Sequence, residues 1–325
     1  MKTLIKIFVP LILSLIFFVQ SSQSDEKFKI GLIVPLSGEY SNIGNSIVKS
    51  VRLAINKIDD NKILIIPKDT KSNPIDALKV STELYNEGVN IIIGPVFNES
   101  TKYLDDLKEV TFISFTNKIR TNPSNVISAG VNAISQINTI KKFINLQKLE
   151  RTIFLIPNNN YKSELEFAID KTKFQLKEKF FYDQDPTMLT KQIEKLTRYP
   201  QRKKNLEDEI KRLEESNIKN KEKKIANLKK RDTLGFINFD SVVIGDFDES
   251  LKSVATSLLY TDVSSKRIHY LTFNQWFDKS LLNEKSLQPI YFPSINKKNY
   301  EQFIDEYNKS YKSIPNQLSF LSYDL

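Results

Sequence analysis

The chain has 325 residues, of which 40% are hydrophobic, 27% are charged and none is cysteine, and its formal net charge is +9. The lack of cysteine excludes a lipid-modified cysteine, a thiolate metal site, a thiol nucleophile and a disulfide framework. Much of the positive charge lies in residues 201–232, where twelve basic side chains outnumber seven acidic ones. The signs are interleaved and no aromatic side chain lies among them for base stacking, so the composition disfavours a nucleic-acid partner.

Residues 1–24 have the layout of a secretory signal peptide. Lys2 and Lys6 form a basic start, residues 8–19 are almost entirely apolar, and a short polar segment follows. The apolar run of about 12 residues is shorter than the roughly 20 that a transmembrane helix needs. We therefore predict that the chain is exported, with a retained N-terminal anchor as the alternative.

From residue 28 onward, apolar strand candidates alternate with amphipathic helix candidates. The strands are continuous apolar runs, which is typical of parallel strands buried on both faces. Their order predicts a doubly wound α/β layer with right-handed crossovers. The predicted strands of this first half are residues 28–36, 62–67, 90–96 and 110–115, and the predicted helices are residues 43–58, 74–87 and 100–107.

The same pattern starts again after residues 125–130. Two successive units of similar layout predict an α/β fold of two lobes, each a doubly wound and mostly parallel sheet, with a ligand cleft between them. We assign residues 27–130 and 250–325 to lobe 1 and residues 131–249 to lobe 2. The predicted helices of this second half are residues 133–146, 161–176, 188–198 and 250–259, and the strands are residues 151–157, 179–182, 241–245 and 270–273.

The first candidate site is the turn Pro35-Leu36-Ser37-Gly38. It follows the first strand and precedes a helix, a place where free backbone N–H groups can bind a carboxylate or another anion. Ser41 or Asn42 is the predicted N-cap of that helix, and Gly44 permits a close approach of the backbone. An ordinary capped junction between a strand and a helix is the alternative interpretation.

That turn and several later segments resemble the type 1 periplasmic solute-binding proteins, the leucine/isoleucine/valine-binding family. The resemblance implies a two-lobed fold that captures a small polar ligand, such as an amino acid, in the periplasm for an ABC-type permease, without a cofactor. Lys162 stands where the family has glycine, and the family continues with a further helix at Tyr323-Asp324, so the chain is either a fragment or closes its lobes differently. The matching segments are Pro35 to Gly38, Ile93-Gly94-Pro95, Phe112 to Asn117, Ile156 to Tyr161, Trp276-Phe277-Asp278 and Phe303 to Asp324.

A solute-binding function assigns nine residues to the ligand. In lobe 1, hydroxyl, amide and backbone N–H donors would hold a ligand carboxylate. In lobe 2, a tyrosine would close over the ligand and a carboxylate would pair with its ammonium group. A helix cap or a turn former is the alternative role for each of them. The nine residues are Ser37, Gly38, Ser41, Asn98, Ser100, Ser114 and Thr116 in lobe 1, and Tyr161 and Asp246 in lobe 2.

Residues 200–231 form a charged insertion in lobe 2. Two sets of apolar positions fall out of phase across Ser216-Asn217, so we predict a helical hairpin that turns there, with a solvated charged arm as the simpler interpretation. The first set is Leu206, Ile210 and Leu213, and the second is Ile218, Ile225 and Leu228.

A second function is possible because the insertion and the sequence KKRDTLGFINFDSVVIGD that follows it resemble the penicillin-binding protein activators. That subgroup of the fold is similar to envelope lipoproteins that regulate a peptidoglycan synthase through protein contacts. This chain departs from those lipoproteins because it has no lipobox cysteine. Regulation of a synthase is therefore the alternative to ligand capture.

Nothing in the sequence indicates catalysis. The single histidine, His269, lies at the start of a short apolar strand, where a structural role is the simpler interpretation. The chain has no G-x-S-x-G, H-E-x-x-H or G-x-x-x-x-G-K motif. We predict a non-enzyme without a metal site, whose partners are a small polar ligand and either an ABC permease or a peptidoglycan synthase.

Overall fold

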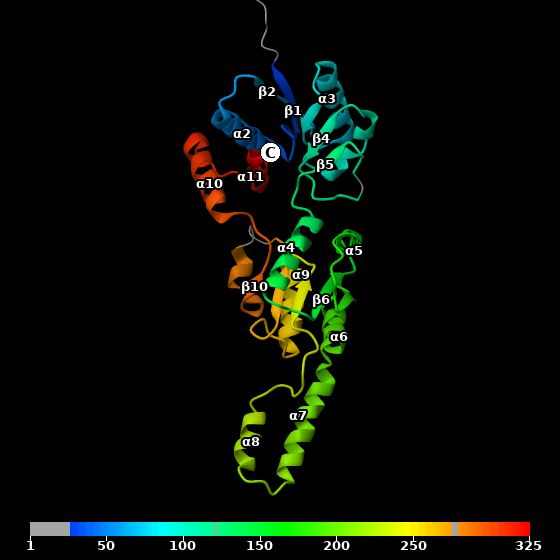
Figure 1. Ribbon diagram of the computed structural model, residues 1–325, viewed down its shortest axis with the longest axis vertical. Helices are drawn as coiled ribbons and strands as arrows, with labels where there is room; N and C mark the ends of the chain where they lie inside the picture. The colour runs from blue at the N-terminus through cyan, green and yellow to red at the C-terminus, as the bar shows by residue number, and fades with distance from the viewer. Residues whose placement is uncertain (1–26, 121, 275–278) are drawn as a thin grey trace, which may run out of the picture. The chain divides into compact units, whose positions relative to one another are not determined.

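The computed structural model describes residues 27–120, 122–274 and 279–325. Within these residues the chain forms two compact units, each built on its own sheet of five parallel strands (Figure 1). Residues up to Thr116, residues 122–129 and residues 304–325 form unit 1, and the rest forms unit 2. The predicted α/β fold with two lobes is confirmed. The predicted signal peptide and the Trp276-Phe277-Asp278 motif lie outside the described residues.

The sheet of unit 1 has the strand order β2-β1-β3-β4-β5. Its strands are β1 (Phe28–Val34), β2 (Ile63–Asp69), β3 (Ile91–Ile93), β4 (Thr111–Ser114) and β5 (Val126–Ser128). Its helices are α2 (Ser41–Ile58), α3 (Pro74–Asn86), the 3-10 turns η1 (Asn98–Thr101) and η2 (Leu104–Asp106), and α11 (Gln317–Asp324). Helix α10 (Lys297–Tyr311) contains the boundary between the two units.

Both faces of the unit 1 sheet are buried, as the continuous apolar runs predict. Successive side chains of β1 point to opposite faces, so Ile33 packs with Leu84 of α3 while Leu32 packs with Ile47 of α2. All four of these side chains are at most 1% exposed. Burial at this level contributes about 1.5–3 kcal/mol for each large apolar side chain.

The sheet of unit 2 has the strand order β10-β9-β8-β6-β7. Leu155 of β6 packs with α6 and α9, and Phe154 packs on the other face with α4 and α5. The strands are β6 (Thr152–Pro157), β7 (Glu178–Tyr182), β8 (Ser241–Ile244), β9 (His269–Thr272) and β10 (Ile290–Tyr291). The helices are α4 (Ala133–Leu146), α5 (Lys162–Lys171), α6 (Pro186–Thr197), α7 (Tyr199–Glu214), α8 (Lys221–Leu228) and α9 (Asp248–Tyr260), with the 3-10 turns η3 (Lys279–Asn283) and η4 (Lys285–Leu287).

The predicted return of the chain to lobe 1 at residue 250 is corrected by the structure. Strand β9 pairs in parallel with β8, with Val243 opposite Leu271, and β10 pairs in turn with β9. Helix α9 packs on α6 through the unit 2 core. These pairings keep the chain in unit 2 up to Phe303, and only residues 304–325 return to unit 1.

Three short elements also differ from the prediction. The helix predicted over residues 100–107 is two 3-10 turns, where the hydroxyl of Thr101 donates to the Asn98 carbonyl and competes with regular helix formation. Strand β5 lies in the segment that we treated only as a connection. Strand β10 has two residues and follows Pro289, so no apolar run marks it in the sequence.

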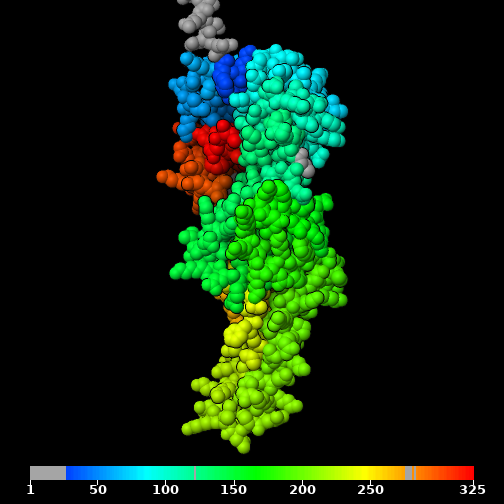
Figure 2. All heavy atoms as spheres, turned by 45° about the vertical axis from the view of Figure 1, so that its right-hand side comes forward, coloured from blue at the N-terminus to red at the C-terminus, as the bar shows by residue number. Residues whose placement is uncertain are grey.

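The insertion is a helical hairpin, as predicted. Helix α7 ends at Glu214 and α8 begins at Lys221, so the chain turns across Ser216-Asn217. The two helices pack side by side, and the hairpin extends from the body of unit 2 (Figures 1 and 2). Leu206 and Leu213 of α7 are buried, whereas α8 has no buried residue.

Candidate functional site

The turn after β1 already holds a carboxylate, which belongs to Asp69. The parallel register places Val34 opposite Asp69, so the carboxyl ends of β1 and β2 meet. Asp69 Oδ1 accepts hydrogen bonds from the backbone N–H groups of Leu36 at 2.8 Å, Ser37 at 3.4 Å and Lys71 at 2.9 Å. Asp69 Oδ2 accepts the Ser37 hydroxyl at 2.6 Å. The predicted anion seat is therefore occupied from within the chain, and the donor groups of Ser37 hold Asp69.

These hydrogen bonds also set the acidity of Asp69. Burial raises the pKa of its carboxyl group, but the hydrogen bonds from Ser37, Lys71 and Leu36 outweigh burial and lower that pKa below 3.8. The carboxylate is thus ionised at neutral pH and fixes the turn that leads into α2.

Close backbone packing brings the strand ends of unit 1 together. A Cβ atom on Gly44 would lie 1.9 Å from the Pro35 carbonyl oxygen, and one on Gly94 would lie 2.1 Å from the Ile33 carbonyl oxygen. Gly94 also has φ +111, a conformation that side chains disfavour. The close approach predicted for Gly44 is confirmed. The predicted N-cap is wrong, because Tyr40 is the N-cap of α2 and makes no side-chain cap bond.

The structure brings three predicted site residues together at the ends of β3 and β4. The Thr116 hydroxyl donates to Asn98 Oδ1 at 3.4 Å, and the Thr116 N–H donates to Ser114 Oγ at 3.2 Å. The buried Ser114 hydroxyl donates to the Pro95 carbonyl at 2.8 Å. The only hydroxyl proton of Ser114 is therefore used within the chain. The half-buried Asn98 carries an amide NH₂ group beside Ser114 and Thr116.

The remaining unit 1 residues flank this group. Gly38 has φ +78 and is exposed, and the Ser41 N–H donates to its carbonyl at 3.2 Å. The Tyr40 and Phe97 rings, each next to a predicted residue, lie 4.9 Å apart between centroids, so the turn before α2 adjoins η1. Ser100 is 1% exposed, and its hydroxyl has no hydrogen-bond partner within the described part of the chain.

Tyr161 and Asp246 both lie in unit 2. The Tyr161 ring packs against Phe247 at 5.8 Å, and burial, followed by the nearby Glu164 charge, raises the pKa of its hydroxyl group. Asp246 is 4% exposed and accepts hydrogen bonds from Tyr182 Oη at 2.7 Å and Gln184 Nε2 at 2.9 Å. Asp246 thus serves as a buried structural acceptor.

Lys162, which stands where the resembled family has glycine, has local partners. Its ammonium group lies 4.4 Å from the centroid of the Phe181 ring and donates to Asn158 Oδ1 at 3.1 Å. A cation over an aromatic ring contributes about 0.5–1 kcal/mol at an exposed site. Lys162 is therefore accommodated at the carboxyl ends of β6 and β7, where Asn158 and Phe181 lie.

Unit 2 also has a small cavity of about 120 Å³. Ser135, Gln136 and Thr139 of α4 line it together with Asn274 and Ser294. Gln136 is 6% exposed, accepts the Asn274 N–H at 2.6 Å and donates to the Val131 carbonyl at 3.3 Å. None of the nine predicted residues lines this cavity. Among the described residues no cluster of acidic, histidine or cysteine side chains could hold a metal ion.

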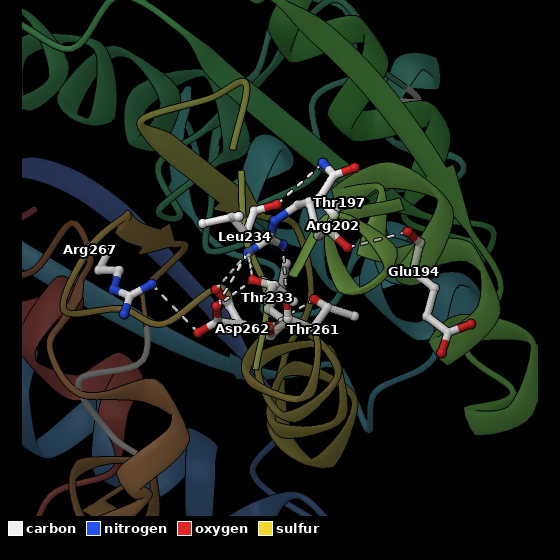
Figure 3. Close-up of polar contacts among 10 residues, drawn as sticks. Glu194, Thr197, Arg202, Thr233, Leu234, Thr261, Asp262 and Arg267 are labelled. Atoms are coloured by element: carbon white, nitrogen blue, oxygen red, sulfur yellow. Dashed lines mark hydrogen bonds and ion pairs between the residues drawn. The ribbon is translucent and has the colours of Figure 1, made fainter. Parts of the chain in front are cut away.

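Arg202 fixes the base of the hairpin to unit 2 (Figure 3). Its guanidinium group donates to the Thr261 carbonyl at 2.9 Å and to Thr233 Oγ1 at 2.6 Å, and it pairs with Asp262 Oδ2 at 3.4 Å. The Leu234 N–H returns a bond to the Arg202 carbonyl at 2.9 Å. Burial lowers the pKa of Arg202 and the Asp262 charge opposes that effect. This network was not predicted from the sequence.

Part of the chain matches a known protein family. Residues 27–173 match the model of a family described as periplasmic binding protein. All nine predicted residues except Asp246 lie within that range. A search of curated protein sequences found no match.

Solved structures of ABC transporter proteins share the fold. A putative branched-chain amino acid ABC transporter from Rhodospirillum rubrum matches with a TM-score of 0.63 and 11% identity over 92% of this chain and 81% of its own. A branched chain amino acid ABC transporter periplasmic ligand-binding protein from Burkholderia xenovorans LB400 matches with a TM-score of 0.57 and 12% identity over 91% and 75%. An ABC transporter substrate-binding protein from Sphaerobacter thermophilus matches with a TM-score of 0.55 and 11% identity over 92% and 78%.

The fold is that of the type 1 periplasmic binding proteins, as the sequence motifs predict. The resemblance to that family is confirmed at the level of the family model and the fold. The narrower resemblance to the penicillin-binding protein activators stays a prediction.

Proposed function

We propose that this chain is a non-catalytic, exported solute-binding protein that captures a small polar ligand for an ABC-type transporter. The observation that carries the proposal is the match of residues 27–173 to the periplasmic binding protein family, because this range contains the polar strand ends of unit 1. The named structural neighbours support it, since each is described as part of an ABC transporter. An amino acid is the ligand class that the sequence resemblance favours.

The ligand would bind at the carboxyl edge of the unit 1 sheet, where ligands of open α/β sheets bind. Asn98 is the residue we expect to matter most, because its amide can donate to a carboxylate while its oxygen is held by Thr116. Gly38 and Ser41 would contribute from the adjoining turn. Ser37 and Ser114 would support the fold around the ligand, because their hydroxyl groups already have partners within the chain. Asp246 would have a structural role within unit 2.

A thermal-shift screen with amino acids and small aromatic carboxylates tests the proposal. A ligand present at about 100 times its dissociation constant adds about 2.7 kcal/mol to the free energy of unfolding. Asn98→Ala should weaken binding of any hit. Asn90→Ala is the matched control, because Asn90 is exposed and directly precedes β3, whereas Asn98 lies in η1 after that strand. A screen without a hit, or a hit that binds both variants alike, argues against this site.

The hairpin favours one further candidate function, which is regulation of a peptidoglycan synthase through protein contacts. The supporting observation is that α8 buries none of its residues and leaves its side chains available to a partner. A pull-down of a purified synthase by the full chain, lost on deletion of residues 205–229, would support this alternative over ligand capture.

A further inference from the structure

The charge of the hairpin is divided unevenly between its two helices. Residues 199–215, which contain α7, carry five basic and five acidic side chains and are neutral. Residues 216–231, here called the α8 arm, carry seven basic side chains and one acidic one, a net charge of +6. The α8 arm therefore supplies two-thirds of the +9 charge of the whole chain. The seven basic residues are Lys219, Lys221, Lys223, Lys224, Lys229, Lys230 and Arg231.

Most of this charge is exposed and unneutralised. Lys229 pairs with Glu214 at 3.7 Å, and Lys221 donates to the Glu214 carbonyl at 3.2 Å. Lys219, Lys223, Lys230 and Arg231 are exposed and have no ion pair with a described carboxylate. The apolar side chains Ile225 and Leu228 are half-buried in the α8 arm, which packs along α7.

The base of the hairpin is bonded to the body of unit 2, and α8 packs along α7. Arg202 bonds to Thr261, Thr233 and Asp262 near the start of α7, and this network does not involve the arm itself. An arm that is anchored at its base and buries no residue of α8 is poorly explained as part of the core.

We propose that the α8 arm docks the protein on an anionic phospholipid bilayer. The complementary charge is the main argument, because clustered lysines are attracted to anionic headgroups. A protein partner fits less well, since lysine is depleted and aromatic residues are enriched at protein interfaces, and the arm has no aromatic residue. The association would stay at the surface, because no helix among the described residues is long and apolar enough to cross a bilayer. This proposal does not depend on ligand capture.

The test is co-sedimentation with lipid vesicles. It uses the chain from Asp25 onward, which lacks the predicted signal peptide and retains every strand of both sheets. Vesicles of phosphatidylcholine mixed with phosphatidylglycerol should bind the protein at low salt, and vesicles of phosphatidylcholine alone should not. Each basic residue near an anionic surface strengthens binding by about fivefold. The variant Lys219→Gln, Lys223→Gln, Lys230→Gln and Arg231→Gln should therefore bind at least about a hundredfold more weakly.

A second variant with the same net charge separates position from total charge. It carries Lys79→Gln, Lys142→Gln, Lys191→Gln and Lys266→Gln, four exposed sites outside the hairpin. We expect it to bind anionic vesicles like the wild type, with both variants keeping the wild-type circular dichroism spectrum. High salt should release the wild type, because the Debye length falls from about 10 Å at 0.1 M to about 3 Å at 1 M. Equal loss in the two variants, or no binding of the wild type at low salt, overturns the proposal and leaves an acidic protein as the partner of the α8 arm.

Discussion

Replacing Asp69 by alanine should loosen the turn that joins β1 to α2. The change removes the acceptor of three backbone N–H groups and of the Ser37 hydroxyl. A hydrogen bond contributes about 0.5–1.5 kcal/mol net, and the half-exposed position and the long 3.4 Å bond favour the low end of that range. The four bonds together give an expected loss of about 2 kcal/mol in the free energy of unfolding at neutral pH.

Asp60→Ala is the matched control for this change. Asp60 precedes β2, the strand that Asp69 ends, and its carboxylate accepts one hydrogen bond, from the Lys62 N–H at 2.8 Å. Its loss should cost about 0.5 kcal/mol. Urea unfolding of both variants, followed by circular dichroism, gives the comparison. Equal losses for the two variants would refute the assignment of Asp69 as the residue that holds the turn.

The pH dependence gives an independent check through Asp69→Asn. The folded-state pKa of Asp69 is lowered, so its ionisation stabilises the protein above the unfolded value of 3.8, and this contribution is lost as the pH falls through the folded-state pKa. The stability difference between the wild type and Asp69→Asn should therefore be full near neutral pH and shrink below pH 3.8. A difference that stays constant over this window contradicts the lowered pKa.

Three further changes test the rest of the structure. Arg202→Ala should lower the free energy of unfolding by about 2–3 kcal/mol. This is less than the roughly 3–5 kcal/mol typical of a broken buried ion pair, because Arg267 still lies 3.5 Å from Asp262. A loss below about 0.5 kcal/mol, the size expected of a surface substitution, would show that Arg202 does not anchor the hairpin. Deletion of residues 205–229 should lower the melting temperature less than Arg202→Ala does, because the Arg202 network remains; loss of cooperative unfolding would instead make the hairpin part of the core. Ser100→Ala should leave stability unchanged or raise it by about 1 kcal/mol, because the buried hydroxyl it removes has no partner among the described residues, and a clear drop in the melting temperature would show that this hydroxyl is bonded.

The strands that form continuous apolar runs were predictable because both of their faces are buried, whereas the short strands β5 and β10 were not. Ile33 and Leu32 point to opposite faces and both are buried, so no polar residue interrupts the run in the sequence. The hairpin was predictable for a similar reason, since the apolar phase changes across Ser216-Asn217 where the helices reverse. The place where the chain leaves unit 2 was not predictable, because β9 looks like a strand of either unit until its pairing with β8 is known.

The sequence indicated which polar residues lie at strand ends but not which hydrogen bonds they make, and the ligand site itself stays a prediction. Ser37 and Ser114 lie at strand ends as expected, but their partners are Asp69 and Pro95, which lie elsewhere in the sequence. One signal for Asp69 was available in the sequence. Asp69 comes shortly after the apolar run of residues 63–66, as Pro35 comes after that of residues 30–34, and neighbouring parallel strands end at the same edge of a sheet. We ended that strand at Pro67 and so missed the carboxylate. No local pattern marks the network around Arg202, because its partners come from two segments, Thr233-Leu234 and Thr261-Asp262, that lie far from it in the sequence.

Calorimetric titration of the wild type, Asn98→Ala and Asn90→Ala with the best ligand of the thermal-shift screen tests ligand capture most directly. The wild type and Asn90→Ala should bind one ligand per chain with equal affinity. Asn98→Ala should bind at least about tenfold more weakly, because a hydrogen bond to a charged group contributes about 1.5–3 kcal/mol. Equal affinity of all three proteins would contradict a ligand site at the carboxyl edge of the unit 1 sheet.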